Sequence, residues 1–168
     1  MNRKFEVGEH LVYGLHGVCR LEEITVDGAS GETTYVLQPL GDKRCRLFIP
    51  CGNEICLSKM RKVLSREEAE ALILEMPHME ENWISQESQR KMVFADILKR
   101  GDRREIAQLI KTISLTEIRL KEKGKRLYRV DEKTMKDAKK ILYGEFAHVL
   151  GMKFEDVEPY VLEKIQVA

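Results

Sequence analysis

The sequence contains four cysteines and four histidines, the side chains that most often bind zinc or act as nucleophile and base. Three cysteines lie within twelve positions, and two histidines could approach them from another strand. These residues are Cys45, Cys51, Cys56, His10 and His16. The paired CxxC or CxxH spacing that is typical of structural zinc is absent. We therefore expect no metal and no other cofactor.

His16 and Cys19 could form a base and a thiol nucleophile, and this is the enzymatic interpretation of the sequence. Their spacing is not diagnostic, and no acidic residue is evident that would orient the histidine. Cysteines in a reducing cytosol also rarely form disulfides. We expect free thiols that belong mainly to the core, and no enzymatic activity.

Basic residues are concentrated in one block, although the net charge of the chain is only +1. Residues 83–129 carry 13 basic and 6 acidic side chains, whereas residues 65–82 carry 1 basic and 6 acidic side chains. A local basic surface is typical of proteins that bind a polyanion, although a solvated helix face has the same composition. The acidic stretch at 67–81 could face a basic partner or favour the dipole of a helix.

The chain of 168 residues is 43% hydrophobic, which suits one ordinary domain or two small ones. No apolar run approaches the roughly 18 to 20 residues of a transmembrane helix. The first ten residues lack the apolar segment and the cleavage site of a secretory signal. We therefore expect a cytoplasmic protein.

The first 58 or so residues have the pattern of short strands separated by glycine and aspartate. The predicted strands are 11–13, 17–26, 33–38 and 44–49, with a possible fifth at 55–57. Alternation in the fourth directs Cys45, Leu47 and Ile49 toward the core and the residues between them outward. So many strands without a helix between them indicate a small antiparallel barrel or a strongly curved sheet, in a domain over residues 1–62.

From Ser65 onward the hydrophobic period is helical, which predicts an all-α cluster over residues 63–168 and an α+β chain of two domains. The predicted helices are 67–75, 86–99, 103–123, 131–150 and 156–165. Ser65 and Glu68 form a capping box, as do Asp102 and Glu105. Ser85 and Asp131 are the other candidate caps, and Met92, Ile97 and Leu98 are apolar positions of the second helix.

Several separate motifs occur in order along nearly the whole chain. In the N-terminal half they are VGEHLVYGLHGVCRLE, YVLQPL and LFIP; in the C-terminal half they are ENW, ILKRGDRREIAQLIKTI, DEKTMKDAKKILYGEFAHVLG and FEDVEPYVLEKI. With these motifs the chain resembles the CarD/CdnL family of bacterial RNA polymerase-binding transcription regulators. The N-terminal half is also similar to the polymerase-interacting domain of transcription-repair coupling factors, and the C-terminal motifs favour the CarD/CdnL family.

The resemblance implies a Tudor-like barrel that docks on the RNA polymerase β subunit, partly through an exposed sheet edge. Its expected contacts are Thr25, Val26, Arg44, Arg46 and Phe48. The helical domain is expected to contact promoter DNA at the upstream edge of the melted bubble, where the family's tryptophan enters the minor groove. Trp83 is the only tryptophan in the chain and takes that role by resemblance. Such a wedge would stabilise the open complex.

Arg90 and Lys91 are expected to hold phosphates without reading base sequence. In the family, arginines follow the tryptophan almost directly, whereas residues 84–89, which begin with ISQES, intervene here. The further candidates for phosphate contacts are Arg100, Arg103 and Arg104. An alternative interpretation is an adaptor that docks on the polymerase while its helical domain recruits another protein and never touches DNA. We expect a monomer in either case.

Overall fold

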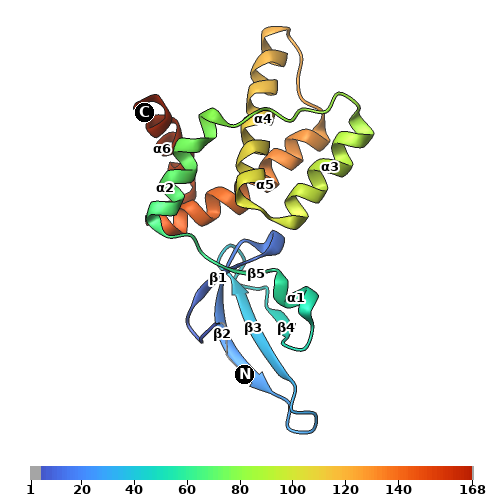
Figure 1. The fold of residues 1–168 in the computed structure, drawn as a ribbon, viewed down its shortest axis with the longest axis vertical. Coiled ribbons are helices and arrows are strands. Elements are labelled where there is room, and N and C mark those ends of the chain that lie inside the picture. Colours follow the sequence, from blue (N-terminus) through green and yellow to red (C-terminus); the bar gives the residue numbers. More distant parts are fainter. Residues whose placement is uncertain (1–4, 168) are drawn as a thin grey trace. The chain divides into compact units, whose positions relative to one another are not determined.

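The structure is a computed structural model that describes residues 5–167, and the side chains of residues 5–165. The chain divides between Val63 and Leu64 into two compact units. The first unit contains an antiparallel sheet and the second a cluster of helices, so the predicted α+β class is confirmed (Figure 1). None of the described helices combines the length and the apolar character that a membrane span requires.

The N-terminal unit is a sheet with the strand order β4-β3-β2-β1-β5, in which every neighbouring pair is antiparallel. The strands are β1 (His10–Tyr13), β2 (Val18–Val26), β3 (Thr33–Pro39), β4 (Leu47–Pro50) and β5 (Met60–Lys62). The long β2 and β3 strands form its centre (Figure 1). β4 and β5 occupy the two edges, so closure into the predicted barrel stays a prediction.

One core cluster of this unit lies on a single face of the sheet. Leu11 and Leu21 are fully buried there, and Leu37 of β3 pairs with Leu21 in register. The register shifts between Leu21 and Glu23, which marks a bulge in the long β2 strand. On β4 the predicted alternation is confirmed for Phe48, which is exposed, and Ile49, which is buried.

Two strand predictions need correction. The fourth strand begins only at Leu47, because residues 42–44 form a turn in which the Asp42 side chain accepts the N–H of Arg44 at 3.0 Å. The predicted fifth strand is wrong, since residues Glu54–Ser58 form the short helix α1. Asn53 caps this helix by accepting the N–H of Cys56 at 3.1 Å, and β5 follows it.

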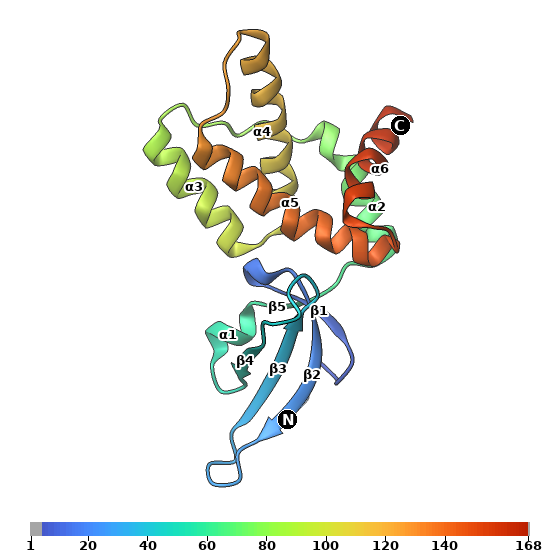
Figure 2. The same ribbon diagram turned by 180° about the vertical axis from the view of Figure 1, so that it is seen from behind.

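The C-terminal unit contains the helices α2 (Arg66–Glu75), α3 (Glu87–Arg100), α4 (Arg103–Glu122), α5 (Arg129–Leu150) and α6 (Phe154–Val167). The long α5 helix packs against all four of the others, as Figures 1 and 2 show from opposite sides. The fully buried Phe94, Ile110 and Phe146 come from three different helices and meet in one core. α5 is thus the element around which this unit is built.

The predicted caps are partly correct. Ser65 and Glu68 form the predicted capping box of α2, and Asp102 caps α4 by accepting the N–H of Glu105 at 3.0 Å. Ser85 does not cap α3, whose cap position is Gln86. α5 already begins at residue 129, so Asp131 lies buried in its first turn instead of capping it. Of the predicted apolar positions of α3, residues 97 and 98 are buried, whereas residue 92 is exposed.

Candidate functional site

Trp83 lies in the irregular segment between the short 3-10 helix η2 (Met76–His78) and α3. It is partly buried and packs against the core of the helical unit. Its ring meets Phe94 edge-on, with 6.1 Å between the ring centroids. The guanidinium carbon of Arg90 lies 4.3 Å from the centroid of the Trp83 ring, a cation–π distance. Trp83 is therefore a supported side chain with part of its surface open.

Arg90 supports Trp83 from the interior of the helical unit. Arg90 and Asp131 are both 3% exposed, and two hydrogen bonds of 2.9 and 2.7 Å join the guanidinium to the carboxylate. Arg90 also donates to the carbonyl of Ile84 at 2.9 Å. The hydrogen bonds to Asp131 raise the pKa of Arg90. The structure thus places the charge of Arg90 in a buried pair, and its predicted phosphate contact stays a prediction.

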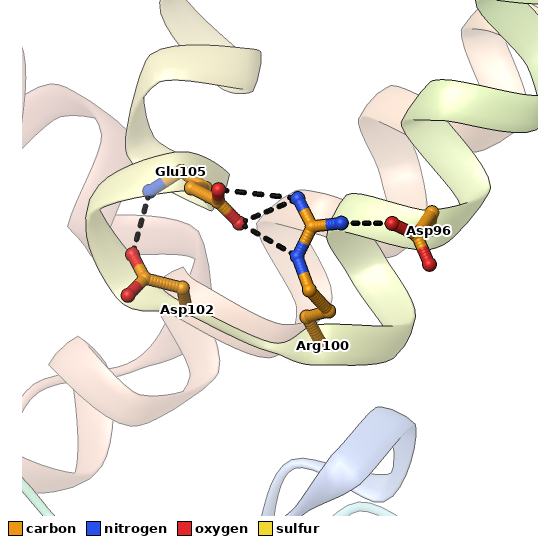
Figure 3. Close-up of polar contacts among 4 residues, drawn as sticks. All are labelled: Asp96, Arg100, Asp102 and Glu105. Carbon is orange, nitrogen blue, oxygen red and sulfur yellow. Dashed lines mark hydrogen bonds and ion pairs between the residues drawn. The ribbon is translucent and has the colours of Figure 1, made fainter.

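Arg100, another predicted phosphate contact, lies between two acidic side chains (Figure 3). It forms an ion pair with Asp96, and its Nη2 lies 3.0 Å from Oε2 of Glu105. Glu105 is in turn fixed by its own N–H, which donates to Asp102 at the start of α4. The charge of Arg100 is thus balanced within the helical unit, although half of the side chain is exposed.

Arg103 and Arg104, which were also predicted to contact phosphates, form ion pairs as well. Arg103 donates to both oxygens of the buried Glu145 at 2.7 and 2.8 Å, and this carboxylate also accepts the N–H of Leu64 at 2.9 Å. Arg104 is 70% exposed and lies 3.0 Å from Glu75 of α2. Acidic residues of α5 and α2 therefore balance the charges of Arg103 and Arg104.

The basic residues between α4 and α5 were not predicted as a site. Gly124 adopts a positive φ of 69°, and the N–H of Lys125 donates back to the carbonyl of Leu120 at 2.8 Å. This is the Schellman arrangement, which ends α4 and turns the chain sharply. The buried Leu127 then anchors the loop on the core. The turn and this anchor leave the neighbouring basic side chains exposed.

We define the α4–α5 loop site as Lys125, Arg126, Tyr128 and Arg129. All four side chains are exposed, and Tyr128 is exposed by 61%. No ion pair is found between these three basic residues and any acid of the described chain. The sequence signal that could have found them is the run KGKRLYR, in which a turn glycine and an aromatic residue interrupt basic residues.

An open pocket of about 600 Å³ joins Trp83 to this loop site. Trp83 and Ser85 line it, as do Lys125, Arg126 and Tyr128 of the loop. Lys91, the remaining predicted phosphate contact, is exposed on α3, next to the buried arginine that supports Trp83. The structure thus brings an aromatic ring and unpaired basic side chains to one concave surface, which suits a polyanion with exposed apolar groups.

In the N-terminal unit, Phe48 is exposed by 65% on the edge strand β4. Arg44 and Arg46 are exposed in the segment just before this strand, although they do not belong to it. Helix α1 packs beside β4 and presents Ile55, which is 73% exposed and which the sequence analysis missed. An exposed isoleucine on a short helix could not be recognised while those residues were predicted to be a strand.

Thr25 and Val26 lie at the end of β2, where they pair with Thr34 and Thr33 of β3. Strand β1 pairs only with residues 18–20 on the other side of β2. Beyond Leu21, the outer side of β2 therefore has no strand partner among the described residues. An open edge of this kind can accept an added strand.

Cys19, the candidate nucleophile, lies in the core of the N-terminal unit. Cys19 is completely buried, and burial raises the pKa of its thiol to about 12. Such a thiol is almost entirely protonated at neutral pH. Within residues 5–167, no group of three or more histidine, cysteine or acidic side chains is arranged to hold a metal ion.

A comparison with known protein families found a match in the N-terminal unit. Residues 5–64 match the model of the CarD-like/TRCF RID domain. Over these residues the chain is similar to an RNA polymerase-interacting domain, which confirms the resemblance predicted for the N-terminal half. The match covers the sheet and ends where the helical unit begins. No match was found among curated proteins.

Proposed function

We propose that this protein is a transcription regulator that docks on the RNA polymerase β subunit and contacts promoter DNA at the upstream edge of the bubble. It acts as a cytoplasmic monomer at the nucleoid, without catalysis or a cofactor. The polymerase-interacting domain supports the first half of this proposal. The combination of Trp83 with the unpaired basic loop site at one pocket is the observation that carries the second half.

The proposed DNA contact uses two kinds of interaction. Lys125, Arg126 and Arg129 bind phosphates through their charge, which gives affinity but little base preference. Trp83 occupies the distorted base step at the edge of the bubble and offsets part of the cost of unstacking, which is about a few kcal/mol per step. Because Arg90 and Phe94 support the ring, little side-chain freedom is lost on binding.

The proposed polymerase contact lies on the N-terminal sheet. The open side of β2 at Thr25 and Val26 offers backbone groups to an added strand. Phe48 and Ile55 add exposed apolar surface at the other edge, and Arg44 and Arg46 supply charge beside it. Docking of this domain concentrates the helical domain near the promoter, because the two are in one chain.

Stabilisation of the open complex requires only that the protein binds it better than the closed complex. A difference of about 1.4 kcal/mol shifts the ratio of open to closed complexes tenfold. The effect on transcription is activation where open complexes are scarce, and inhibition where escape from the promoter becomes limiting.

The test is the lifetime of an open complex formed by the cognate polymerase, challenged with a competitor at two salt concentrations. We expect the protein to lengthen this lifetime and the Trp83→Ala variant to lose most of the effect while it still binds polymerase. Trp83→Phe keeps an aromatic ring and should retain an intermediate effect. An unchanged lifetime with the wild-type protein bound to polymerase would contradict the proposal.

The internal pairing of Arg100, Arg103 and Arg104 favours one alternative, an adaptor whose helical domain binds another protein. Binding of the isolated protein to a forked DNA duplex separates the two functions. A DNA-binding regulator should bind the fork with an affinity that falls steeply with salt, whereas an adaptor should not bind it.

A further inference from the structure

The segment before Trp83 has no regular secondary structure after η2, yet hydrogen bonds from α4 hold it along its length. We call residues 77–82 the Trp83 strap; they are the last two residues of η2 and the four residues that connect it to the tryptophan. Side chains of α4 bond to five of these six residues. We infer that these side chains, which are Gln108, Lys111, Thr112 and Arg119, are positioning residues that fix the place of Trp83.

Lys111 makes the central contacts. Its Nζ donates to the carbonyl of Pro77 at 2.7 Å and also to the carbonyl of Met79. One turn earlier on α4, Gln108 donates from Nε2 to the carbonyl of Glu80 at 2.9 Å. Residues 79–82 form no helix or strand, so the carbonyls of Met79 and Glu80 would otherwise have to find water.

The second half of the strap is held next to Trp83 itself. The hydroxyl of the fully buried Thr112 accepts the N–H of Asn82 at 3.1 Å, directly before the tryptophan. Further along α4, Arg119 donates to both oxygens of Glu81 at 2.6 and 2.7 Å. The hydrogen bonds from Arg119 lower the pKa of the Glu81 carboxyl, so this pair stays charged at neutral pH.

The spacing of the four side chains follows from the helix. Positions 108, 111, 112 and 119 lie on one face of α4, because helical neighbours recur every three or four residues. α4 is also the helix that leads into the loop site. Helix α4 therefore fixes the position of the strap that leads to Trp83. It also fixes the point where the loop with the basic residues begins.

The inference deepens the proposed function, since an accurately placed Trp83 matters most if this ring binds DNA. Its test uses the fluorescence of Trp83, the only tryptophan in the chain. We would replace Lys111 by methionine, which keeps the aliphatic stem, and by arginine, which can restore donation to the two carbonyls. Lys121→Met on the same helix is the matched control, because Lys121 pairs with Glu117 and not with the strap.

We expect Lys111→Met to raise acrylamide quenching of Trp83 by about twofold, as the strap loosens locally. Lys111→Arg and Lys121→Met should retain the wild-type quenching. Arg119→Gln removes an exposed contact and therefore tests the strap in a variant that should fold. Circular dichroism and thermal unfolding identify any variant whose helices are lost. Unchanged quenching in both folded Lys111→Met and Arg119→Gln would overturn the inference.

Binding to the forked duplex separates this inference from the proposed function. If wild-type protein binds the fork through Trp83, Lys111→Met should weaken binding roughly twofold to tenfold, the effect of freeing one or two side chains. Unchanged binding with raised quenching would overturn the positioning role. If wild-type protein does not bind the fork, the proposed function fails, and the quenching result alone decides whether α4 positions Trp83.

Discussion

Two basic regions of the helical unit differ in whether their side chains form ion pairs with acidic residues. On α3 and at the start of α4, Arg90, Arg100, Arg103 and Arg104 all form ion pairs. In the loop site between α4 and α5, three basic side chains have no acidic partner in the described chain. Both regions belong to the same basic block of the sequence, but these four arginines are already paired, whereas the loop site offers free positive charge to a polyanion.

The difference arises from tertiary packing. The partners of the paired region come from α2 and α5 as well as from neighbouring turns, for example Glu75 and Glu145. The loop site follows a sharp turn at Gly124 that carries its side chains away from such acids. A local charge count is therefore a weak guide to binding unless the pairing of each residue is known.

The largest predicted effect is on stability, and it should differ between the adjacent basic residues Arg90 and Lys91. Arg90→Gln should lower the free energy of unfolding by about 3 to 5 kcal/mol, because it leaves the carboxylate of Asp131 buried without its partner. Its exposed neighbour Lys91, replaced in the same way, should change stability by less than about 0.5 kcal/mol. Urea unfolding measures both. Equal effects would mean that the pair does not stabilise the helical unit.

Glu145→Ala should have the next largest effect on stability. This carboxylate is 2% exposed and accepts Arg103 together with the N–H of Leu64. Its loss should cost about 2 to 3 kcal/mol, since two donors lose a charged acceptor. Glu163→Ala, at an exposed position of α6, is the control and should stay near wild type. A small effect of Glu145→Ala would show that water replaces the carboxylate easily.

Most helices and strands could be predicted from the sequence, but the ion pairs between distant residues could not. The sequence patterns correctly predicted the capping box at Ser65 and the long apolar face of α4, because both depend on residues within a few positions. Arg90 was predicted to hold phosphates, and its buried pairing was missed because its partner, Asp131, is 41 positions away. No local pattern encodes such a contact. Asp131 was predicted to cap a helix, but in the structure it is the buried partner of Arg90.

The loop site supplies the third prediction, on affinity for DNA. The double variant Lys125→Gln and Arg126→Gln should bind a forked duplex roughly tenfold more weakly at low salt. The salt dependence should also fall, by about 2 in the slope of log K against log salt, as two phosphate contacts are lost. Stability should remain near wild type, because both side chains are exposed. An unchanged slope would place the DNA contact elsewhere or favour the adaptor.

The same reasoning applies to the N-terminal unit. The exposed Phe48 could be predicted from alternation, because a strand has a period of two. Ile55 could not, because three apolar or small residues in a row are compatible with a short strand or a helix turn. Only the cap by Asn53 decides for the helix. Short elements are therefore the places where sequence patterns fail first.

The smallest predicted effect is the sharpest test of the comparison. Arg100→Gln combined with Arg104→Gln removes the same number of charges as the loop variant and serves as its matched counterpart. Both arginines are at least half exposed and pair with partly exposed acids, so stability should change by less than about 1 kcal/mol.

The effect of this double variant on fork binding should stay within about twofold, because the removed charges are already balanced by Asp96, Glu105 and Glu75. Fluorescence titrations at three salt concentrations, run beside the loop variant, give both affinity and slope. A loss as large as that of the loop variant would mean that DNA displaces the acidic partners. Arg100 and Arg104, at the end of α3 and the start of α4, would then belong to the DNA interface. Ion pairing in the free protein would not predict which arginines bind DNA.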